Sequence, residues 1–345
     1  MKANSKAMVL IIALIAALAD LGGFAEEVSP ERLSARKEFQ DLKFGIFIHW
    51  GLYATFAQGE WYLRDAQLDV SEYEKSANAF YPHYFDARAW VRAIKSSGAK
   101  YIVVTSRHHD GFSLWDTKAS DYNIVKATPF KRDVLKELAS ACADEGIKIG
   151  FYYSLLDWRR TDYPQGWCKS LRTAEDSKKA DFDSYLAFMK MQLTELLTNY
   201  GDVMCIWFDG EWDHKKDFDW KFDEIYSLIH RLQPKCLILN NHHHSPRDGE
   251  DIQAFERDLP GENKSGYSEG QEVARNFPLE TNDTMANGAW GYQAKATWKS
   301  VDQLVARLID ANAKGANLLL NIGPRPDGNL PEQSVSILKE MGERR

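Results

Sequence analysis

Short apolar runs alternate with longer segments of helical periodicity along most of this chain, and this alternation constrains the fold more than any other feature. The six clearest runs, each bounded by turn residues, are 44–49, 101–105, 147–153, 203–208, 236–240 and 317–322. Apolar residues at helical spacing occupy 86–97, 132–145, 180–200, 222–232, 301–313 and 332–341. Near-continuous apolar strands that alternate with helices predict a parallel sheet buried on both faces.

The number of strands favours a barrel. Two weaker candidates, 252–256 and 279–281, bring the total to about eight, which is the number that closes a (β/α)8 barrel. Helical segments end at Gly98, Gly146, Gly201 and Gly315 just before an apolar run, as left-handed helix ends require. An open doubly wound sheet is the alternative, but GxGxxG and GxxxxGK[ST] motifs are both absent. We predict an α/β protein with a (β/α)8-like, TIM-type barrel that is irregular where its strands are weak.

The N-terminus has the pattern of a secretory signal peptide. Lys2 and Lys6 precede an apolar run over 7–19, and small residues follow at 23–25. The run is shorter than the roughly 20 residues that cross a bilayer, so no membrane insertion is expected after cleavage. We predict a signal peptide over 1–25, export to the periplasm or the extracellular space, and a catalytic barrel domain over 26–345.

Charge and cysteine content exclude several classes. The chain has 43 basic and 50 acidic side chains, a formal net charge of −7, and no basic stripe that could follow phosphates, so nucleic acid is not an expected partner. Its 4 cysteines are widely separated, without a CxxC pair, and two fall in apolar strand-like runs. They are predicted to be buried thiols.

Chemistry-bearing residues gather where the strands end. Asp209 closes the run 203–208 and shares a strand face with Trp207, so it is predicted to lie at the mouth of the barrel. A carboxylate there could attack an anomeric carbon, or it could simply cap the next helix. The loops 51–85 and 241–284 are long and rich in aromatic or charged residues, as expected of loops that build a site.

Histidines at the strand ends allow two interpretations. His49, Tyr152 and the pair His108–His109 all fall at the predicted mouth, where they could contact sugar hydroxyls and ring faces. A metal site is the competing hypothesis, but adjacent histidines on a strand end point apart and no HExxH motif is present. No metal is therefore predicted, and the triplet 242–244 is interpreted as a solvated loop.

Seven motifs occur in one order along the chain: 44–51 (FGIFIHWG), 59–62 (GEWY), 107–112 (RHHDGF), 151–154 (FYYS), 207–210 (WFDG), 289–292 (AWGY), and 321–324 (NIGP) with 327–328 (DG). From about Lys37 to the C-terminus the chain resembles the family 29 α-L-fucosidases. The resemblance implies that Asp209 is the nucleophile of a retaining glycosidase. It implies substrate contacts from His49, Trp50, Glu60, Trp61, His108, His109, Tyr152, Trp207 and Trp290, with Trp290 near the C6 methyl group of fucose.

The resemblance also implies a general acid/base in the region after the fifth strand. Residues 255–263 offer several carboxylates, of which Glu262 best matches the position used by family members; Glu280 and Glu269 are its rivals. Many family members continue into a β-sandwich domain, which is expected to be absent here because the chain ends near its last predicted helix.

The implied function is that of an exo-acting α-L-fucosidase. It would hydrolyse terminal α-L-fucose from fucosylated glycans through a covalent fucosyl-Asp209 intermediate, without a cofactor. Three alternatives stay open: another retaining exo-glycosidase such as a galactosidase, an inactive sugar-binding barrel, and a metal-dependent hydrolase that uses the histidines.

Overall fold

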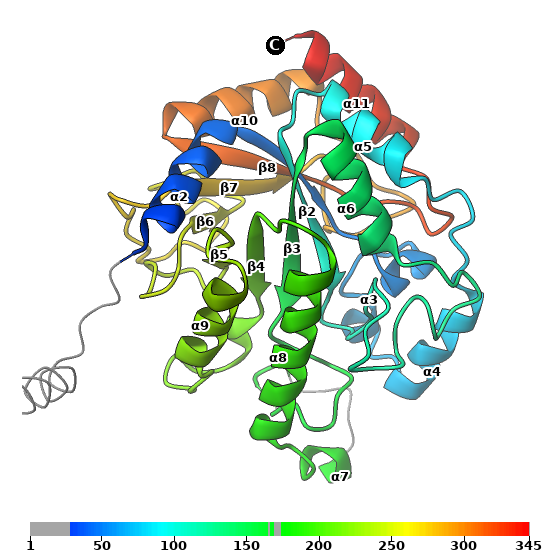
Figure 1. Cartoon of the computed structure of the whole chain (residues 1–345). Coiled ribbons are helices and arrows are strands. Elements are labelled where there is room, and N and C mark those ends of the chain that lie inside the picture. The colour runs from blue at the N-terminus through cyan, green and yellow to red at the C-terminus, as the bar shows by residue number, and fades with distance from the viewer. Residues whose placement is uncertain (1–27, 165, 169–173, 345) are drawn as a thin grey trace, which may run out of the picture.

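The computed structural model describes residues 28–164, 166–168 and 174–344. The predicted signal peptide, 1–25, lies outside the described residues. Eight parallel strands form one sheet in the order β5-β4-β3-β2-β1-β8-β7-β6, curved into a nearly closed barrel (Figure 1). They are β1 Phe44–Ile48, β2 Tyr101–Arg107, β3 Lys148–Ser154, β4 Cys205–Asp209, β5 Leu237–Asn240, β6 Gln253–Glu256, β7 Leu279–Thr284 and β8 Ala316–Ile322. The predicted fold class is confirmed.

Helices cover the outside of the strands (Figure 1). The predicted helices are present as α5 Ala87–Ser96, α6 Val134–Glu145, α8 Phe182–Asn199, α9 Phe222–Leu232, α10 Val301–Ala313 and α11 Glu332–Glu343. The loops add α3 Tyr62–Asp65, α4 Val70–Lys75, α7 Ala174–Ser177 and 3-10 turns at Leu52–Phe56, Ser76–Ala79 and Glu211–Asp213. The stretch 241–278, all of it described, has no helix on either side of β6, so the barrel is irregular there.

One further helix, α2 Pro30–Leu42, was not predicted from the sequence. Two features typical of a helix start are present. The Ser29 side chain accepts a hydrogen bond from Arg32 N, and Pro30 occupies the first turn. Phe39 of this helix packs against Tyr101, with ring centroids 5.4 Å apart. The helix therefore covers barrel residues at the end of the strands opposite to Asp209.

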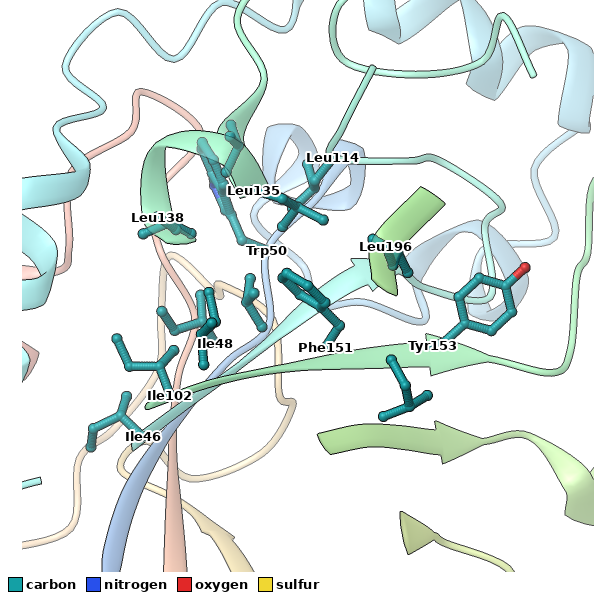
Figure 2. Packing of buried hydrophobic residues seen from close by; sticks show 14 of the residues in the cluster. Ile46, Ile48, Trp50, Ile102, Leu114, Leu135, Leu138, Phe151, Tyr153 and Leu196 are labelled. Carbon is teal, nitrogen blue, oxygen red and sulfur yellow. The ribbon is translucent and has the colours of Figure 1, made fainter. Parts of the chain in front are cut away.

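The strands alternate between two hydrophobic clusters, as their period of two requires. Phe47, Tyr152 and Trp207 point into the barrel. Their neighbours point outward, where Ile46 and Ile48 of β1, Ile102 of β2 and Phe151 and Tyr153 of β3 meet helix residues such as Leu135, Leu138 and Leu196 (Figure 2). The glycines predicted at helix ends have left-handed φ values of 84°, 69°, 75° and 77°, and all 4 cysteines are buried free thiols, as predicted.

The barrel closes between its two shortest strands, β5 and β6, through a parallel bridge between Leu239 and Ile252. Buried Asp251 stabilises this contact between β5 and β6, which is called the seam below. Its backbone N–H donates to Ile238 O at 2.7 Å, and its Oδ2 accepts from Ile238 N at 2.9 Å. Its Oδ1 accepts from Arg32 Nη2 at 2.9 Å and Arg36 Nε at 2.8 Å, which ties α2 to the seam.

Replacing Asp251 with alanine is expected to lower the free energy of unfolding by about 3–5 kcal/mol, because it leaves two buried guanidinium groups without their counter-ion. Urea unfolding measures the loss. Asp144→Ala is the matched control, since Asp144 pairs with Arg88 at the surface and its loss should leave stability nearly unchanged. Equal stability losses in the two variants would contradict this account of the seam.

Candidate active site

A cavity of about 610 Å³ opens at the C-terminal ends of the strands. Side chains from β1, β3, β4, β6 and β7 and from each of the loops that follow β1 through β7 line it. The lining includes nine of the residues predicted to act there: His49, Glu60, Trp61, His108, His109, Tyr152, Trp207, Asp209 and Trp290. The structure thus brings together residues from six of the seven sequence motifs.

Asp209, the last residue of β4, is held by donors from three directions. Tyr152 OH donates to its Oδ2 at 2.9 Å, and Trp212 Nε1 donates to its Oδ1 at 2.9 Å. Asn241 Nδ2 lies 3.4 Å from Oδ1, and His109 Nε2 lies 3.6 Å from Oδ2. The donors from Tyr152, Trp212 and Asn241 fix the direction of the carboxylate into the cavity, which a nucleophile requires.

His49 and His109 present unprotonated nitrogens to the cavity. Asn321 Oδ1 can only accept, so His49 Nδ1 donates to it over 2.7 Å. Ser154 Oγ gives its proton to Leu156 O, so His109 Nδ1 must donate to Ser154 over 2.7 Å. Burial lowers the pKa of His49 to about 3 and that of His109 to about 4, so both rings are neutral at physiological pH. Each leaves Nε2 free to accept a hydrogen bond from a sugar hydroxyl.

Glu60 connects the first long loop to the late aromatic motif. Its Oε2 accepts from Gly291 N at 2.7 Å, and burial raises its pKa. Trp290, the residue before Gly291, lies beside His49 with ring centroids 5.3 Å apart. The buried carboxyl group therefore positions an aromatic wall of the cavity from a segment more than 200 residues away.

Glu256, the last residue of β6, is the second carboxyl group at the centre of the cavity. Its Oε2 accepts from Asn241 Nδ2 at 2.8 Å. Burial, and next the negative charge of Asp209, raises its pKa to about 7. Asn241 Nδ2 also lies 3.4 Å from Asp209 Oδ1. The distance between Asp209 Oδ1 and Glu256 Oε2 therefore cannot exceed the sum of the two distances from Asn241 Nδ2. Such a carboxyl group can donate a proton near neutral pH and take it back.

The three carboxylates that the sequence favoured as acid/base lie elsewhere, and this corrects the prediction. Glu262 forms ion pairs with Lys264 at 3.0 Å and Lys314 at 3.6 Å, outside the cavity, and Lys264 lowers its pKa. Glu280 is buried inside the barrel, where it accepts from Tyr101 OH at 2.8 Å and Trp207 Nε1 at 2.9 Å. Glu269 is exposed and does not line the cavity. Geometry therefore favours Glu256.

Trp50 is also placed differently from its prediction as a substrate contact. Its side chain is 1% exposed and lies in the outer hydrophobic cluster (Figure 2). There it packs against Phe80, Phe85 and Trp90. The physical reason is the strand period of two: His49 points into the barrel, so Trp50 points outward.

Several lining residues were missed from the sequence. Besides Glu256, they include Trp167, Trp212, Asn241, His243, Arg257 and Tyr267. The prediction of a solvated loop over 242–244 was wrong for two of its histidines, because His242 is buried against Glu250 at 3.0 Å and His243 lines the cavity. Glu256 ends its strand as Asp209 ends β4, and that shared position was the signal that could have identified it.

The described residues offer neither a grouped set of metal ligands nor a membrane-spanning helix. Among the described residues, no three His, Cys, Asp or Glu side chains are grouped as a metal ion would need. Nor does that part of the chain contain a helix long and apolar enough to span a bilayer.

A parallel (β/α)8-like barrel with paired carboxyl groups in an aromatic cavity at its C-terminal face is the architecture of the barrel glycoside hydrolases. The family model described as Alpha-L-fucosidase matches residues 25–344. The chain belongs to the α-L-fucosidase family, as the sequence motifs implied.

Individual relatives agree with this assignment. The chain is 30% identical to Alpha-L-fucosidase 1 of Arabidopsis thaliana, over 92% of this chain and 60% of that protein. It is 28% identical to the human plasma alpha-L-fucosidase, over 90% of this chain and 68% of that one. It therefore spans only part of the length of both relatives.

Solved structures show the same fold. Alpha-L-fucosidase isoenzyme 1 from Paenibacillus thiaminolyticus superposes with a TM-score of 0.81 at 37% identity, covering 91% of this chain and 76% of that one. Alpha-L-fucosidase AlfC from Lactobacillus casei, in complex with its α-L-fucose product, gives 0.77 at 30% identity, covering 90% and 98%.

Proposed function

We propose that this protein is an exo-acting, retaining α-L-fucosidase that releases terminal α-L-fucose from glycans, with Asp209 as nucleophile and Glu256 as acid/base. The observation that carries the proposal is the amide of Asn241, which contacts both carboxylates. It places one oxygen of each carboxyl group within two hydrogen-bond lengths of the other, which supports the roughly 5–5.5 Å separation of a retaining enzyme over the roughly 6.5–9.5 Å of an inverting enzyme.

In the first step Asp209 attacks the anomeric carbon of the bound fucoside. The bond from that carbon to the glycosidic oxygen breaks, and protonated Glu256 gives its proton to the departing oxygen. The products are a fucosyl ester of Asp209, the ionised carboxylate of Glu256 and the free leaving alcohol. The pKa of about 7 keeps a large fraction of Glu256 protonated for this step at neutral pH.

In the second step ionised Glu256 takes a proton from water as the water oxygen attacks the anomeric carbon. The ester bond to Asp209 breaks, and fucose leaves with its original configuration after two inversions. Both carboxyl groups return to their starting protonation states. Neither step requires a cofactor.

The lining of the cavity suits a sugar that carries one apolar substituent besides its hydroxyl groups. The Nε2 atoms of His49 and His109 accept hydroxyl protons, and the indole of Trp290 gives an apolar surface for the C6 methyl group. A 6-hydroxyl group would lose hydration against that surface without a polar partner, which disfavours L-galactose by an amount on the order of 1–3 kcal/mol.

The wild-type protein is therefore expected to release 4-nitrophenol from the α-L-fucoside at least tenfold faster than from the α-L-galactoside, which differs from it only by a 6-hydroxyl group, compared as kcat/KM. Proton NMR of the first-formed sugar should show the α-anomer. Faster turnover of the galactoside would replace this proposal with the alternative of another exo-glycosidase. Turnover that disappears with EDTA would favour the metal-dependent hydrolase.

Export through residues 1–25 stays a prediction from the sequence.

A further inference from the structure

An exposed aromatic ring stands beside the acid/base at the mouth of the cavity. Tyr267 is 47% exposed and lines the cavity, although large aromatic side chains are usually buried. Its ring stacks on His243 with centroids 5.5 Å apart and an interplanar angle of 23°. His243 Nε2 in turn lies 3.7 Å from Glu256 Oε2. The three side chains form a continuous path from the centre of the cavity to its rim.

The chemistry fixes which side of the cavity the leaving group occupies. The glycosidic oxygen must come within hydrogen-bonding distance of Glu256 while Asp209 approaches the opposite face of the anomeric carbon. The sugar that carries this oxygen must therefore lie on the side of Glu256. His243 and Tyr267 supply the aromatic surface on that side.

The loop that carries Tyr267 is fixed before any ligand arrives. Buried Asp258 accepts from Lys264 N at 2.9 Å and Ser265 N at 3.1 Å. After Tyr267, Gln271 Nε2 donates to Ala254 O at 2.9 Å and His244 O at 3.2 Å. The loop is thus tied to β6 and to the segment of His243, so little conformational entropy would be lost on binding.

We propose that Tyr267, seated on His243, is the platform that binds the leaving sugar, an uncharged pyranose whose apolar face stacks on the phenol ring. This inference rests on the proposed function, because it takes the position of the leaving group from Glu256. Burial lowers the pKa of His243 to about 4, so the ring under Tyr267 is neutral at physiological pH. A neutral aromatic surface favours the C–H face of a pyranose.

Trp167 is the rival platform, because it is 57% exposed and also lines the cavity. It lies on the side of the nucleophile: its Nε1 donates to Trp212 O at 2.8 Å, and Trp212 Nε1 donates to Asp209. A leaving group that departs toward Glu256 moves away from this side, so Trp167 is expected to contribute less to binding it.

The test compares two substrates with the same fucose. One is α-L-fucosyl fluoride, whose leaving group is too small to reach the rim. The other is the fucosyl disaccharide that the wild-type protein hydrolyses fastest from a panel of linkage isomers. Tyr267→Ala is expected to lower kcat/KM for the disaccharide by a factor on the order of ten, about 1.4 kcal/mol, and to leave the fluoride unchanged. Tyr267→Phe should retain wild-type rates on both.

Two control variants sharpen the result. Tyr84→Ala removes a tyrosine that is 59% exposed and does not line the cavity, so it should change neither substrate. Trp167→Ala tests the rival: a selective loss on the disaccharide in this variant, without one in Tyr267→Ala, would overturn the proposal.

The remaining outcomes are also decisive. Equal losses on both substrates in Tyr267→Ala would assign Tyr267 to the fucose site or to folding, and no loss on either would show that the ring binds nothing. Wild-type hydrolysis of the fluoride but of no disaccharide would also overturn the platform. Hydrolysis of neither substrate would contradict the proposed fucosidase function itself.

Discussion

Asp209→Ala is expected to slow 4-nitrophenol release from the α-L-fucoside by a factor on the order of 10⁴ or more, because the covalent intermediate cannot form. The truncation leaves space for a small anion beside Tyr152 and Trp212, the two donors that hold the carboxylate. Added azide should therefore restore part of the rate and yield β-L-fucosyl azide, the product of one inversion instead of two.

A matched control distinguishes lost chemistry from lost folding. Asp217→Ala removes an exposed aspartate in the loop that follows β4, outside the cavity, and should keep wild-type activity. Thermal unfolding of both variants should resemble that of the wild type. An Asp209→Ala protein that keeps a tenth of the wild-type activity would exclude Asp209 as the nucleophile.

Glu256→Ala is expected to lower kcat/KM for a fucosyl disaccharide by about 10²–10⁴. A sugar alkoxide leaves poorly without a proton, and Glu256 is the cavity carboxyl group with a pKa near neutrality that shares Asn241 with the nucleophile. The change for 4-nitrophenyl fucoside should be much smaller in kcat/KM, because 4-nitrophenolate leaves unprotonated. Its kcat should still fall, because water attack on the ester lacks a base.

Glu262→Ala provides the comparison, because Glu262 was the preferred acid/base from sequence and now lies in a lysine ion pair outside the cavity. It should keep wild-type rates on both substrates. A large loss in Glu262→Ala with an unaffected Glu256→Ala would reverse the assignment.

The pH profile tests the same residue independently. Glu256 must be protonated in the free enzyme, and its pKa is raised to about 7, so kcat/KM for the disaccharide should fall as the pH rises through about 7. Glu256→Gln cannot lose that proton, so its low residual rate should show no such decline. A wild-type profile that stays flat to pH 9 would contradict the assignment.

Fold prediction succeeded where the signal was local. The six clear strands lie within two residues of their predicted bounds, and α9 and α10 match theirs, because backbone periodicity and the glycines that end helices act over a few residues. The helix α2 was missed although its capping residue Ser29 can be recognised in the sequence. Two of its buried residues are arginines, so its buried face lacks the apolar periodicity that indicates a helix. The ion pairs that tie Asp251 to α2 were also missed, because Arg32 and Arg36 are more than 200 residues away from it.

The sequence by itself determined the parallel barrel, the position of Asp209 at the end of β4 and many of the side chains that line the cavity, because a strand end fixes both depth and direction in a barrel. Only the tertiary structure decided which glutamate faces Asp209, that Trp50 packs in the core, and that His243 and Tyr267 reach the cavity. These depend on the path of the helix-free segment between β5 and β7. That path is set by hydrogen bonds and burial between distant residues, which no local pattern records.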